Sequence, residues 1–190
     1  MSFDFAHARD IMVDSQVRPQ DVTDLAIQDA MRAAPRESLL PPERALTAYA
    51  DTEVEYAPGR YLLRPRDIAK LLHGLKPRAG ERALAIAAPY AAMVLETMGL
   101  DVTRVDGADV KAPPAGSWPL VVSENAVSDV PAAWLAAIAP GGRMGAIVRQ
   151  AHLGHATLFL RLASGVTSRV LFDCGTPVMP EFRAEPGFVF

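Results

Sequence analysis

The spacing of apolar residues along the chain changes its period near residue 80. Before that point the period is helical, because apolar side chains recur at i, i+3, i+4 and i+7 at Ile27, Ala30, Met31 and Ala34. A second stripe follows Pro65 and ends before Pro77; it consists of Ile68, Leu71, Leu72 and Leu75. A short helical piece up to about residue 48 and an exposed strand over 52–56 lie between the two stripes. We therefore expect an N-terminal helical region over residues 1–78.

From Arg82 onward the pattern alternates between strands and helices. The predicted strands cover residues 82–87, 102–106, 119–122 and 143–148, and the predicted helices cover 90–98 and 131–139. Such alternation is typical of a mostly parallel sheet with helices on its faces. Residues 156–172 predict a hairpin around Ser164 and Gly165, and we expect the apolar end at 188–190 to dock on the body. Residues 79–190 are thus expected to form the sheet and hairpin of one α/β domain that spans residues 1–190.

The apolar run from Ala83 to Leu95 predicts a buried strand, a tight turn and a helix. In doubly wound α/β proteins, a nucleotide-like ligand meets the sheet at such a turn. Here the turn is Ala87, Ala88 and Pro89, which contribute two methyl groups and a ring without an N–H, and no glycine. The chain therefore has the frame of a cofactor site without its usual contact surface, and we expect a turn filled by core side chains.

The link between the second and third predicted strands is short. A further helix and strand need roughly 11 plus 5 residues before turns are added. Only Gly107 to Trp118 is available, and this stretch contains Pro113, Pro114 and Gly116. We expect a loop here, and hence a sheet that lacks one helix-strand unit. The uncovered sheet edge makes a homodimer plausible, because an unpaired edge tends to find a partner.

Composition narrows the class of protein. Half of the 190 residues are apolar and the net charge is -3, which favours a sizeable core and argues against a nucleic-acid partner. The single cysteine, Cys174, excludes an internal disulfide and suits a reducing compartment. We see no secretory signal, and the longest apolar run is shorter than the roughly 20 residues of a membrane span. We therefore expect a cytoplasmic protein without membrane contact.

Several segments along the chain match a known family when they are taken together. They are Met12–Pro19, Ala30–Met31, Pro35–Glu37, Ala48–Asp51, Pro65, Pro140–Arg143 and Leu171–Asp173 with Pro177, Pro180 and Phe182. These segments resemble the protein-L-isoaspartate O-methyltransferases, which use S-adenosylmethionine to methylate the α-carboxyl of isoaspartyl residues in damaged proteins. The resemblance covers most of the chain in order and implies a doubly wound, Rossmann-like methyltransferase sheet preceded by an N-terminal helical region.

On the cofactor side, the resemblance implies that Ala87, Ala88 and Pro89 occupy the position of a Gly-x-Gly-x-Gly turn, which is shorter here and lacks glycine. Asp106 matches the acid that holds the ribose hydroxyls, although an aspartate at a strand end is also a common turn former. Ser123, with the two residues after it, either contacts the ligand or belongs to a polar loop before the next helix.

On the acceptor side, the family carries a Gly-x-x-Gln-Thr-Ile-Ser-like segment. This chain has Leu63 in the position of the serine, and leucine neither donates nor accepts a hydrogen bond. Arg60 and Arg64 either attract a carboxylate or are solvated side chains that flank a buried pair, Leu62 and Leu63.

These departures lead to two hypotheses. In the first, the chain is a degenerate family member that binds no cofactor tightly, is catalytically weak or inactive, and acts as a binding or assembly module. In the second, it is an active S-adenosylmethionine-dependent methyltransferase with a remodelled site for isoaspartyl or another carboxylate. We expect no metal site, since His152 and His155 lack a nearby third ligand.

Overall fold

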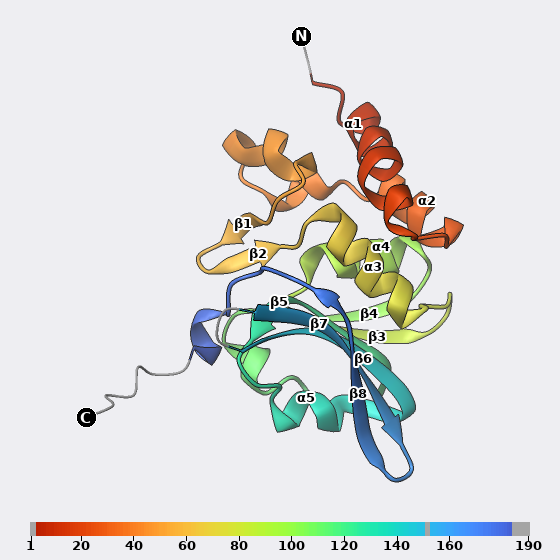
Figure 1. The fold of residues 1–190 in the computed structure, drawn as a ribbon, viewed down its shortest axis with the longest axis vertical. Coiled ribbons are helices and arrows are strands. Elements are labelled where there is room, and N and C mark those ends of the chain that lie inside the picture. Colours follow the sequence, from red (N-terminus) through yellow and green to blue (C-terminus); the bar gives the residue numbers. More distant parts are fainter. Residues whose placement is uncertain (1–2, 151–152, 184–190) are drawn as a thin grey trace, which may run out of the picture.

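The computed structural model describes residues 3–150 and 153–183. Its N-terminal part contains α1 (Phe5–Met12), α2 (Leu25–Ala33) and α3 (Pro65–Leu75), with a π-helical turn over Val13–Val17 and 3-10 helices over Arg18–Gln20, Arg36–Leu39 and Pro42–Tyr49. Before α3 lies an antiparallel hairpin of β1 (Val54–Ala57) and β2 (Arg60–Leu62) (Figure 1). Within the described ranges, none of the helices has the length and apolar character that a membrane crossing requires.

Six strands form the central sheet, in the spatial order β4-β3-β5-β6-β7-β8. They are β3 (Arg82–Ile86), β4 (Asp101–Val105), β5 (Trp118–Val127), β6 (Ile138–Gln150), β7 (Leu153–Leu162) and β8 (Gly165–Asp173). The strands β4, β3, β5 and β6 are parallel, whereas β7 is antiparallel to both of its neighbours. This arrangement confirms the predicted α/β fold and the hairpin that follows its parallel part.

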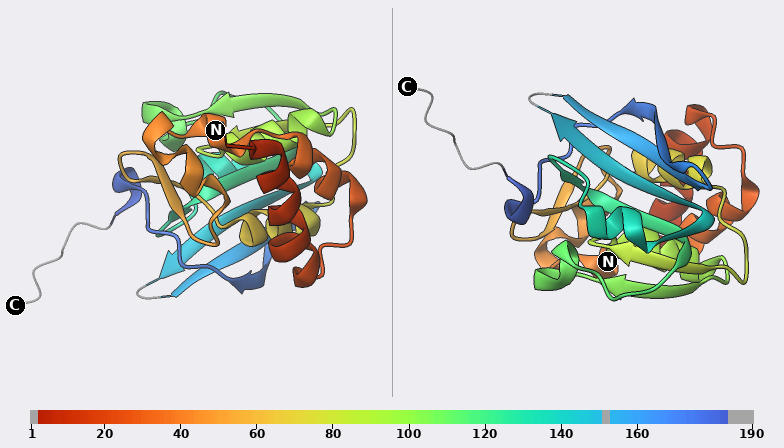
Figure 2. Two further views of the ribbon diagram at one scale, coloured as in Figure 1. Left: turned by 90° about the horizontal axis from the view of Figure 1, so that it is seen from above. Right: turned by 90° about the horizontal axis from the view of Figure 1, so that it is seen from below.

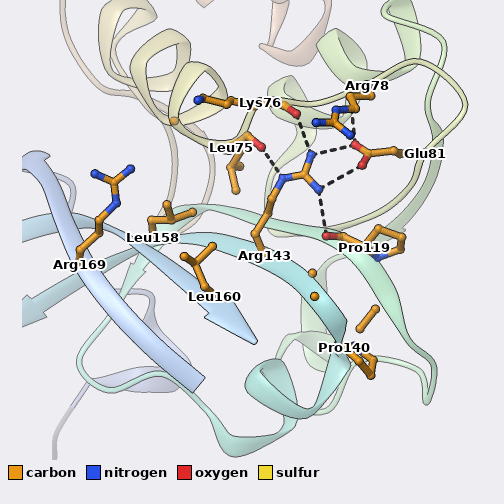
Figure 3. A pocket seen from close by; sticks show the side chains of 14 residues that line it. Leu75, Lys76, Arg78, Glu81, Pro119, Pro140, Arg143, Leu158, Leu160 and Arg169 are labelled. Atoms are coloured by element: carbon orange, nitrogen blue, oxygen red, sulfur yellow. Dashed lines mark hydrogen bonds and ion pairs between the residues drawn. The ribbon is translucent and has the colours of Figure 1, made fainter. Parts of the chain in front are cut away.

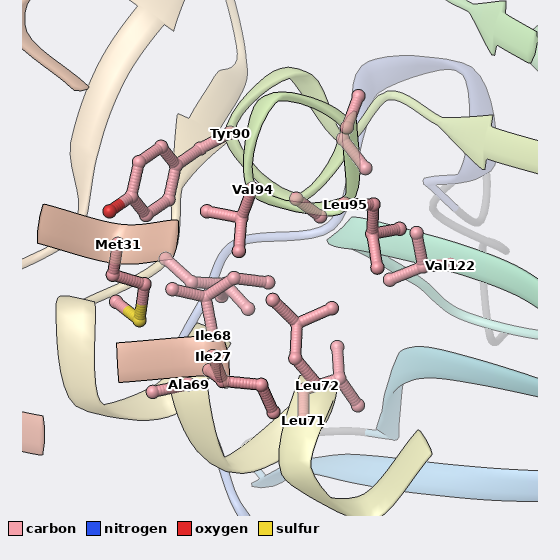
Figure 4. Close-up of a cluster of buried hydrophobic side chains, with 14 of the residues drawn as sticks. Ile27, Met31, Ile68, Ala69, Leu71, Leu72, Tyr90, Val94, Leu95 and Val122 are labelled. Atoms are coloured by element: carbon pink, nitrogen blue, oxygen red, sulfur yellow. The ribbon is translucent and has the colours of Figure 1, made fainter. Parts of the chain in front are cut away.

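Helices cover both faces of the sheet. The helices α3 and α4 (Pro89–Thr97) lie on one face with α1 and α2 outside them, and α5 (Ala132–Ala137) lies on the other (Figures 1 and 2). Because side chains alternate across a strand, β3 contributes to two separate cores. Ala83 and Ala85 belong to the core beneath α3 and α4, whose packing Figure 4 shows, and Leu84 and Ile86 pack with Trp134 of α5.

Both predicted helical stripes are confirmed. The four residues of the first stripe, in α2 and at its end, are at most 4% exposed, and the four residues of the second stripe, in α3, are fully buried. Asp24 is the capping residue of α2, since its carboxylate accepts hydrogen bonds from the N–H groups of Ala26 and Ile27. Helix α3 begins at Pro65 and ends where Lys76 adopts a left-handed conformation with φ of 50°.

The structure differs from the prediction in several boundaries. Helix α5 is shorter than expected, because β6 already begins at Ile138. The link after β4 holds one 3-10 helix over Gly107–Lys111 and no strand, so β4 is an edge strand. The expected docking of 188–190 concerns residues outside the described ranges, and His152 also lies outside them.

Candidate functional site at the carboxyl ends of the parallel strands

The turn between β3 and α4 is closed by core side chains. Ala87 is fully buried and Ala88 is 2% exposed, as expected for a filled turn. Ala87 adopts a φ of 45°, a left-handed conformation that normally favours glycine. Hydrogen bonds fix it from both sides: its N–H donates to the Val105 carbonyl at 2.8 Å, and its own carbonyl accepts from Asn125 Nδ2 at 2.7 Å. The backbone of this turn therefore already has partners within the chain.

Asn125 reaches the turn because β5 bulges at its carboxyl end. Val122 pairs with Gly145 of β6, but the next pair joins Ala126 to Ile147, so β5 holds two extra residues in this interval. The bulge turns the Asn125 carboxamide toward β3 and β2. Its Nδ2 donates to the Ala87 carbonyl, and its Oδ1 accepts from the Tyr61 N–H at 2.7 Å. One side chain thus ties β5, the β3–α4 turn and β2 together.

Glu124 lies in the same bulge and caps α4. Its Oε1 accepts from the Ala91 N–H at 2.7 Å, at the first turn of a helix that has no cap of its own. The side chain is fully buried, and burial raises its pKa to about 7. Backbone N–H groups and the positive charge of Arg36 oppose this rise, because they favour the carboxylate. An internal carboxyl group therefore occupies the end of α4 where an anion is best stabilised.

A buried arginine and a buried tyrosine accompany Glu124. Arg36 is fully buried; its Nε donates to the Ala48 carbonyl at 2.7 Å and its Nη2 donates to the Leu63 carbonyl. The Arg36 guanidinium lies 4.7 Å from the ring centroid of Tyr90, whose position on α4 is labelled in Figure 4. Arg36 Nη1, Tyr90 Oη and Glu124 Oε2 have no hydrogen-bond partner among the described residues. The cluster combines a cation, a phenol and a carboxyl group out of contact with solvent.

Asp106 stands after β4, as predicted, and both of its carboxylate oxygens have partners. Oδ1 accepts from the Gly107 N–H at 2.8 Å and lies 3.2 Å from Arg60 Nε, and Oδ2 accepts from the Tyr56 hydroxyl at 3.1 Å. Burial, with the nearby charge of Asp106, raises the pKa of Tyr56, so this phenol remains a donor. Asp106 joins β4 to the β1–β2 hairpin, and its predicted contact with a ribose stays a prediction.

The two arginines near β2, Arg60 and Arg64, differ in their exposure to solvent. Arg60 is only 5% exposed and pairs with both Asp106 and Glu181, the latter at 2.8 Å. The expectation of a solvated arginine is therefore wrong for Arg60, because the described C-terminal residues cover it. Arg64 is partly exposed, and its Nε lies 2.7 Å from Asp67 and 3.6 Å from Glu53. Each arginine thus has two carboxylates of this chain within ion-pair distance.

The remaining predicted positions are interior. Leu62 and Leu63 are fully buried, as expected for the apolar pair. Ser123 is also fully buried, and its hydroxyl donates to the Asn125 carbonyl at 3.2 Å, so the expectation of a polar loop there is wrong. Pro89 is the first residue of α4. In the part of the chain that the structure describes, no group of three or more potential metal ligands occurs.

The contacts of Glu124, Asn125, Arg36 and Tyr90 were not predicted from the sequence, where the first two are only the neighbours of Ser123 and Arg36 is only part of the segment Pro35–Glu37. A fully buried charge is uncommon, and charged residues are ordinarily assigned to the surface. One signal was present: Glu124 and Asn125 interrupt an otherwise apolar strand. The structure brings Ala87, Asp106 and Ser123 together near the carboxyl ends of the parallel strands. There Asn125 bonds the Ala87 carbonyl and Glu124 bonds the start of α4.

No family model matches the chain. The protein-L-isoaspartate O-methyltransferase of Methylorubrum extorquens strain PA1 is 37% identical over 105 residues, or 54% of this chain and 46% of that protein. The same-named protein of Methylorubrum populi is 36% identical over 105 residues, or 54% of this chain and 49% of that protein. The chain thus spans about half the length of the curated relatives it matches.

Two solved structures share the fold. A putative protein-L-isoaspartate O-methyltransferase from Plasmodium falciparum, in complex with S-adenosyl-L-homocysteine, superposes with a TM-score of 0.71 at 13% identity and covers 95% of this chain and 100% of that one. A second protein-L-isoaspartate O-methyltransferase gives 0.69 at 16% identity, covering 90% of this chain and 65% of that one. The chain is therefore similar in sequence to protein-L-isoaspartate O-methyltransferases over 105 residues and has the fold of the solved ones.

Proposed function

We propose that this chain is a protein-L-isoaspartate O-methyltransferase-like protein that no longer binds S-adenosylmethionine tightly and acts as a binding or assembly module. The observation that carries the proposal is the Asn125 carboxamide, which bonds the Ala87 carbonyl and the Tyr61 N–H across the carboxyl edge of the sheet. A cofactor in this position needs open backbone and open space. Here the turn is buried, the Ala87 N–H is taken by the Val105 carbonyl, and the Ala87 carbonyl is taken by Asn125.

The groups that remain do not fit the cofactor. The backbone of Ala87 has a partner on its N–H and on its carbonyl, and the Asp106 carboxylate is occupied by Arg60, Tyr56 and Gly107. Glu124 places its own carboxyl group at the start of α4, where it already accepts the Ala91 N–H that a ligand carboxylate would otherwise use. Binding at this edge requires breaking several buried hydrogen bonds without replacement, each at a cost of about 1–3 kcal/mol.

The acceptor side supports the same proposal. The Leu63 side chain offers no polar group, and Arg36 takes the Leu63 carbonyl. Arg60 and Arg64, the cations that otherwise suit a substrate carboxylate, are paired with carboxylates of the chain. Methylation of an isoaspartyl carboxyl therefore lacks both a free cation and a polar cradle here. We propose a cytoplasmic setting, supported by the single buried cysteine, Cys174.

Calorimetric titration with S-adenosylmethionine and S-adenosylhomocysteine tests the proposal. We expect no heat of binding at millimolar ligand and no transfer of labelled methyl groups to an isoaspartyl peptide. An active isoaspartyl methyltransferase, titrated and assayed in parallel, is the positive control. Micromolar binding instead supports the second hypothesis, an active S-adenosylmethionine-dependent enzyme for isoaspartyl or another carboxylate, and removes the first.

The assembly role proposed here uses a second copy of the chain. Strand β4 is at one edge of the sheet, and no strand of the described residues pairs with its outer side. Such an edge exposes unpaired N–H and carbonyl groups along its length. We propose that two copies pair through β4.

A further inference from the structure

A second candidate site lies at the opposite end of the parallel strands. A cavity of about 450 Å³ opens between the end of α3, the first residues of β6, and strands β7 and β8 (Figure 3). Its volume is within the range of small-molecule sites. We propose that this cavity binds a small organic anion, with a carboxylate or phosphate head and a short apolar body.

The floor of the cavity is rigid because Arg143 fixes it. Its guanidinium donates to the carbonyls of Leu75, Lys76 and Pro119, at 2.8 Å for Lys76 and 3.2 Å for Pro119. It also forms a two-pronged pair with Glu81, with distances of 2.8 and 3.1 Å. Arg143 thereby joins the end of α3 to the starts of β3 and β5, and Glu81 balances its charge.

Three other cations line the cavity, and Glu81 is close to only one of them, Arg78, whose backbone N–H donates to it at 3.0 Å. Lys76 and Arg78 come from the segment after α3, and Arg169 comes from β8 on the far side of Arg143 (Figure 3). All three are exposed, and the ion pairs of the described residues join none of them to a carboxylate. Cationic groups from separate elements that converge on one concavity raise its potential and attract anions. The head of the ligand is therefore negatively charged.

An apolar wall accompanies the cations. Leu75, Leu158 and Leu160 line the cavity, and the last two also line a smaller adjoining one of about 60 Å³ that shares Arg169. Leu158 is 4% exposed and Leu160 is partly buried, so both present a fixed surface. A ligand with its head near Lys76 and Arg78 can bury a short apolar body against these leucines. An inorganic anion can contact the cations of this site, but it has no apolar body to pack against the leucines.

Isothermal titration at low ionic strength tests the inference with four probes: sodium octanoate, octyl phosphate, acetate and octyl glucoside. We expect octanoate, octyl phosphate or both to bind, which also distinguishes the two head groups. Acetate should bind at least about tenfold more weakly, because it lacks the apolar body. The uncharged octyl glucoside should not bind, and added salt should weaken the binding of the anions.

Two variants localise the binding. Lys76→Gly removes a cation at a residue whose φ of 50° suits glycine, and Arg169→Gln removes one from an exposed strand, so both should fold normally. Each variant should raise the Kd of the tighter-binding anion about tenfold, which is the effect of losing one charged contact. Lys111→Gln, an equal loss of charge on the exposed 3-10 helix after β4, is the control and should bind as the wild type does.

Three outcomes overturn the inference. They are the absence of binding by both amphiphilic anions at millimolar concentration, equal affinity for acetate and octanoate, and equal weakening by Lys111→Gln. Circular dichroism of each variant separates loss of binding from loss of fold. Because the cavity lies at the other end of the strands from the cofactor edge, these results are independent of the titrations with S-adenosylmethionine.

Discussion

At the scale of single residues, Asn125 is the side chain that closes the cofactor position at the carboxyl ends of the parallel strands. Its two polar atoms have different roles, since Nδ2 donates to the Ala87 carbonyl and Oδ1 accepts from the Tyr61 N–H. Asn125→Asp keeps the shape but sets a carboxylate oxygen against a carbonyl oxygen. We expect it to lower the free energy of unfolding by about 2–3 kcal/mol and the Tm by roughly 4–12 °C.

Thermal unfolding followed by circular dichroism measures this effect. Asp129→Asn is a suitable control because it exchanges the same two chemical groups on an exposed residue, where the expected change is within about 0.5 kcal/mol. If Asn125→Asp unfolds at the wild-type temperature, the carboxamide does not hold the edge closed. The main support for the proposed loss of cofactor binding then disappears.

At the scale of elements, the contact between β5 and α4 depends on the protonation of Glu124. Its pKa is about 7 in the folded chain and near 4.5 in the unfolded chain, because burial disfavours the carboxylate. The folded state therefore binds more protons between these values. The stabilisation from Glu124 is fully present below pH 4.5 and is lost as the pH rises through 7.

Glu124→Gln keeps an acceptor for the Ala91 N–H and removes the titration. In urea unfolding, we expect the free energy of unfolding of this variant minus that of the wild type to increase from pH 5 to pH 8. Glu81→Gln is the contrasting control. Although partial burial opposes it, hydrogen bonding to Arg143 holds the pKa of Glu81 below its usual range, so its stabilisation is lost only as the pH falls. A stability difference for Glu124→Gln that stays flat with pH contradicts the assignment.

The elements themselves were largely predictable from the sequence, and their polar interior was not. The stripes of α2 and α3 follow from periodicity because apolar residues at helical spacing must face a core. The short link after β4 follows from chain length alone. By contrast, the burial of Arg36 and Glu124 depends on partners far away in the sequence, such as the Ala48 carbonyl and the start of α4. No local pattern specifies such partners.

The β3–α4 turn shows the same limit at a finer level. The absence of glycine predicted a filled turn, and Ala87 is buried. Sequence alone did not predict that Ala87 adopts a left-handed conformation, with φ of 45°. This conformation costs an alanine roughly 1–2 kcal/mol. The hydrogen bonds from its N–H to Val105 and from Asn125 to its carbonyl offset that cost, and they come from two other strands.

At the scale of the whole molecule, the proposed dimer depends on which backbone groups of β4 point outward. The Asp101 N–H donates to the Glu81 carbonyl, and the Val105 carbonyl accepts from the Ala87 N–H. Because backbone direction alternates along a strand, the N–H and carbonyl groups of residues 101, 103 and 105 face β3. The N–H groups of Val102 and Arg104 therefore face the open edge. These are the donors that a second copy can use.

Arg104→Pro removes one of these donors, whereas Arg104→Ala keeps it, and both lose the ion pair to Glu96. Proline is tolerated on an edge strand because its missing N–H bonds no neighbouring strand. We expect the wild type and Arg104→Ala to be dimers in multi-angle light scattering at high protein concentration, and Arg104→Pro to be a monomer. A monomeric wild type excludes the assembly, and a dimeric Arg104→Pro assigns it to another surface. Because the alanine variant controls for charge, only loss of the backbone donor explains the expected difference.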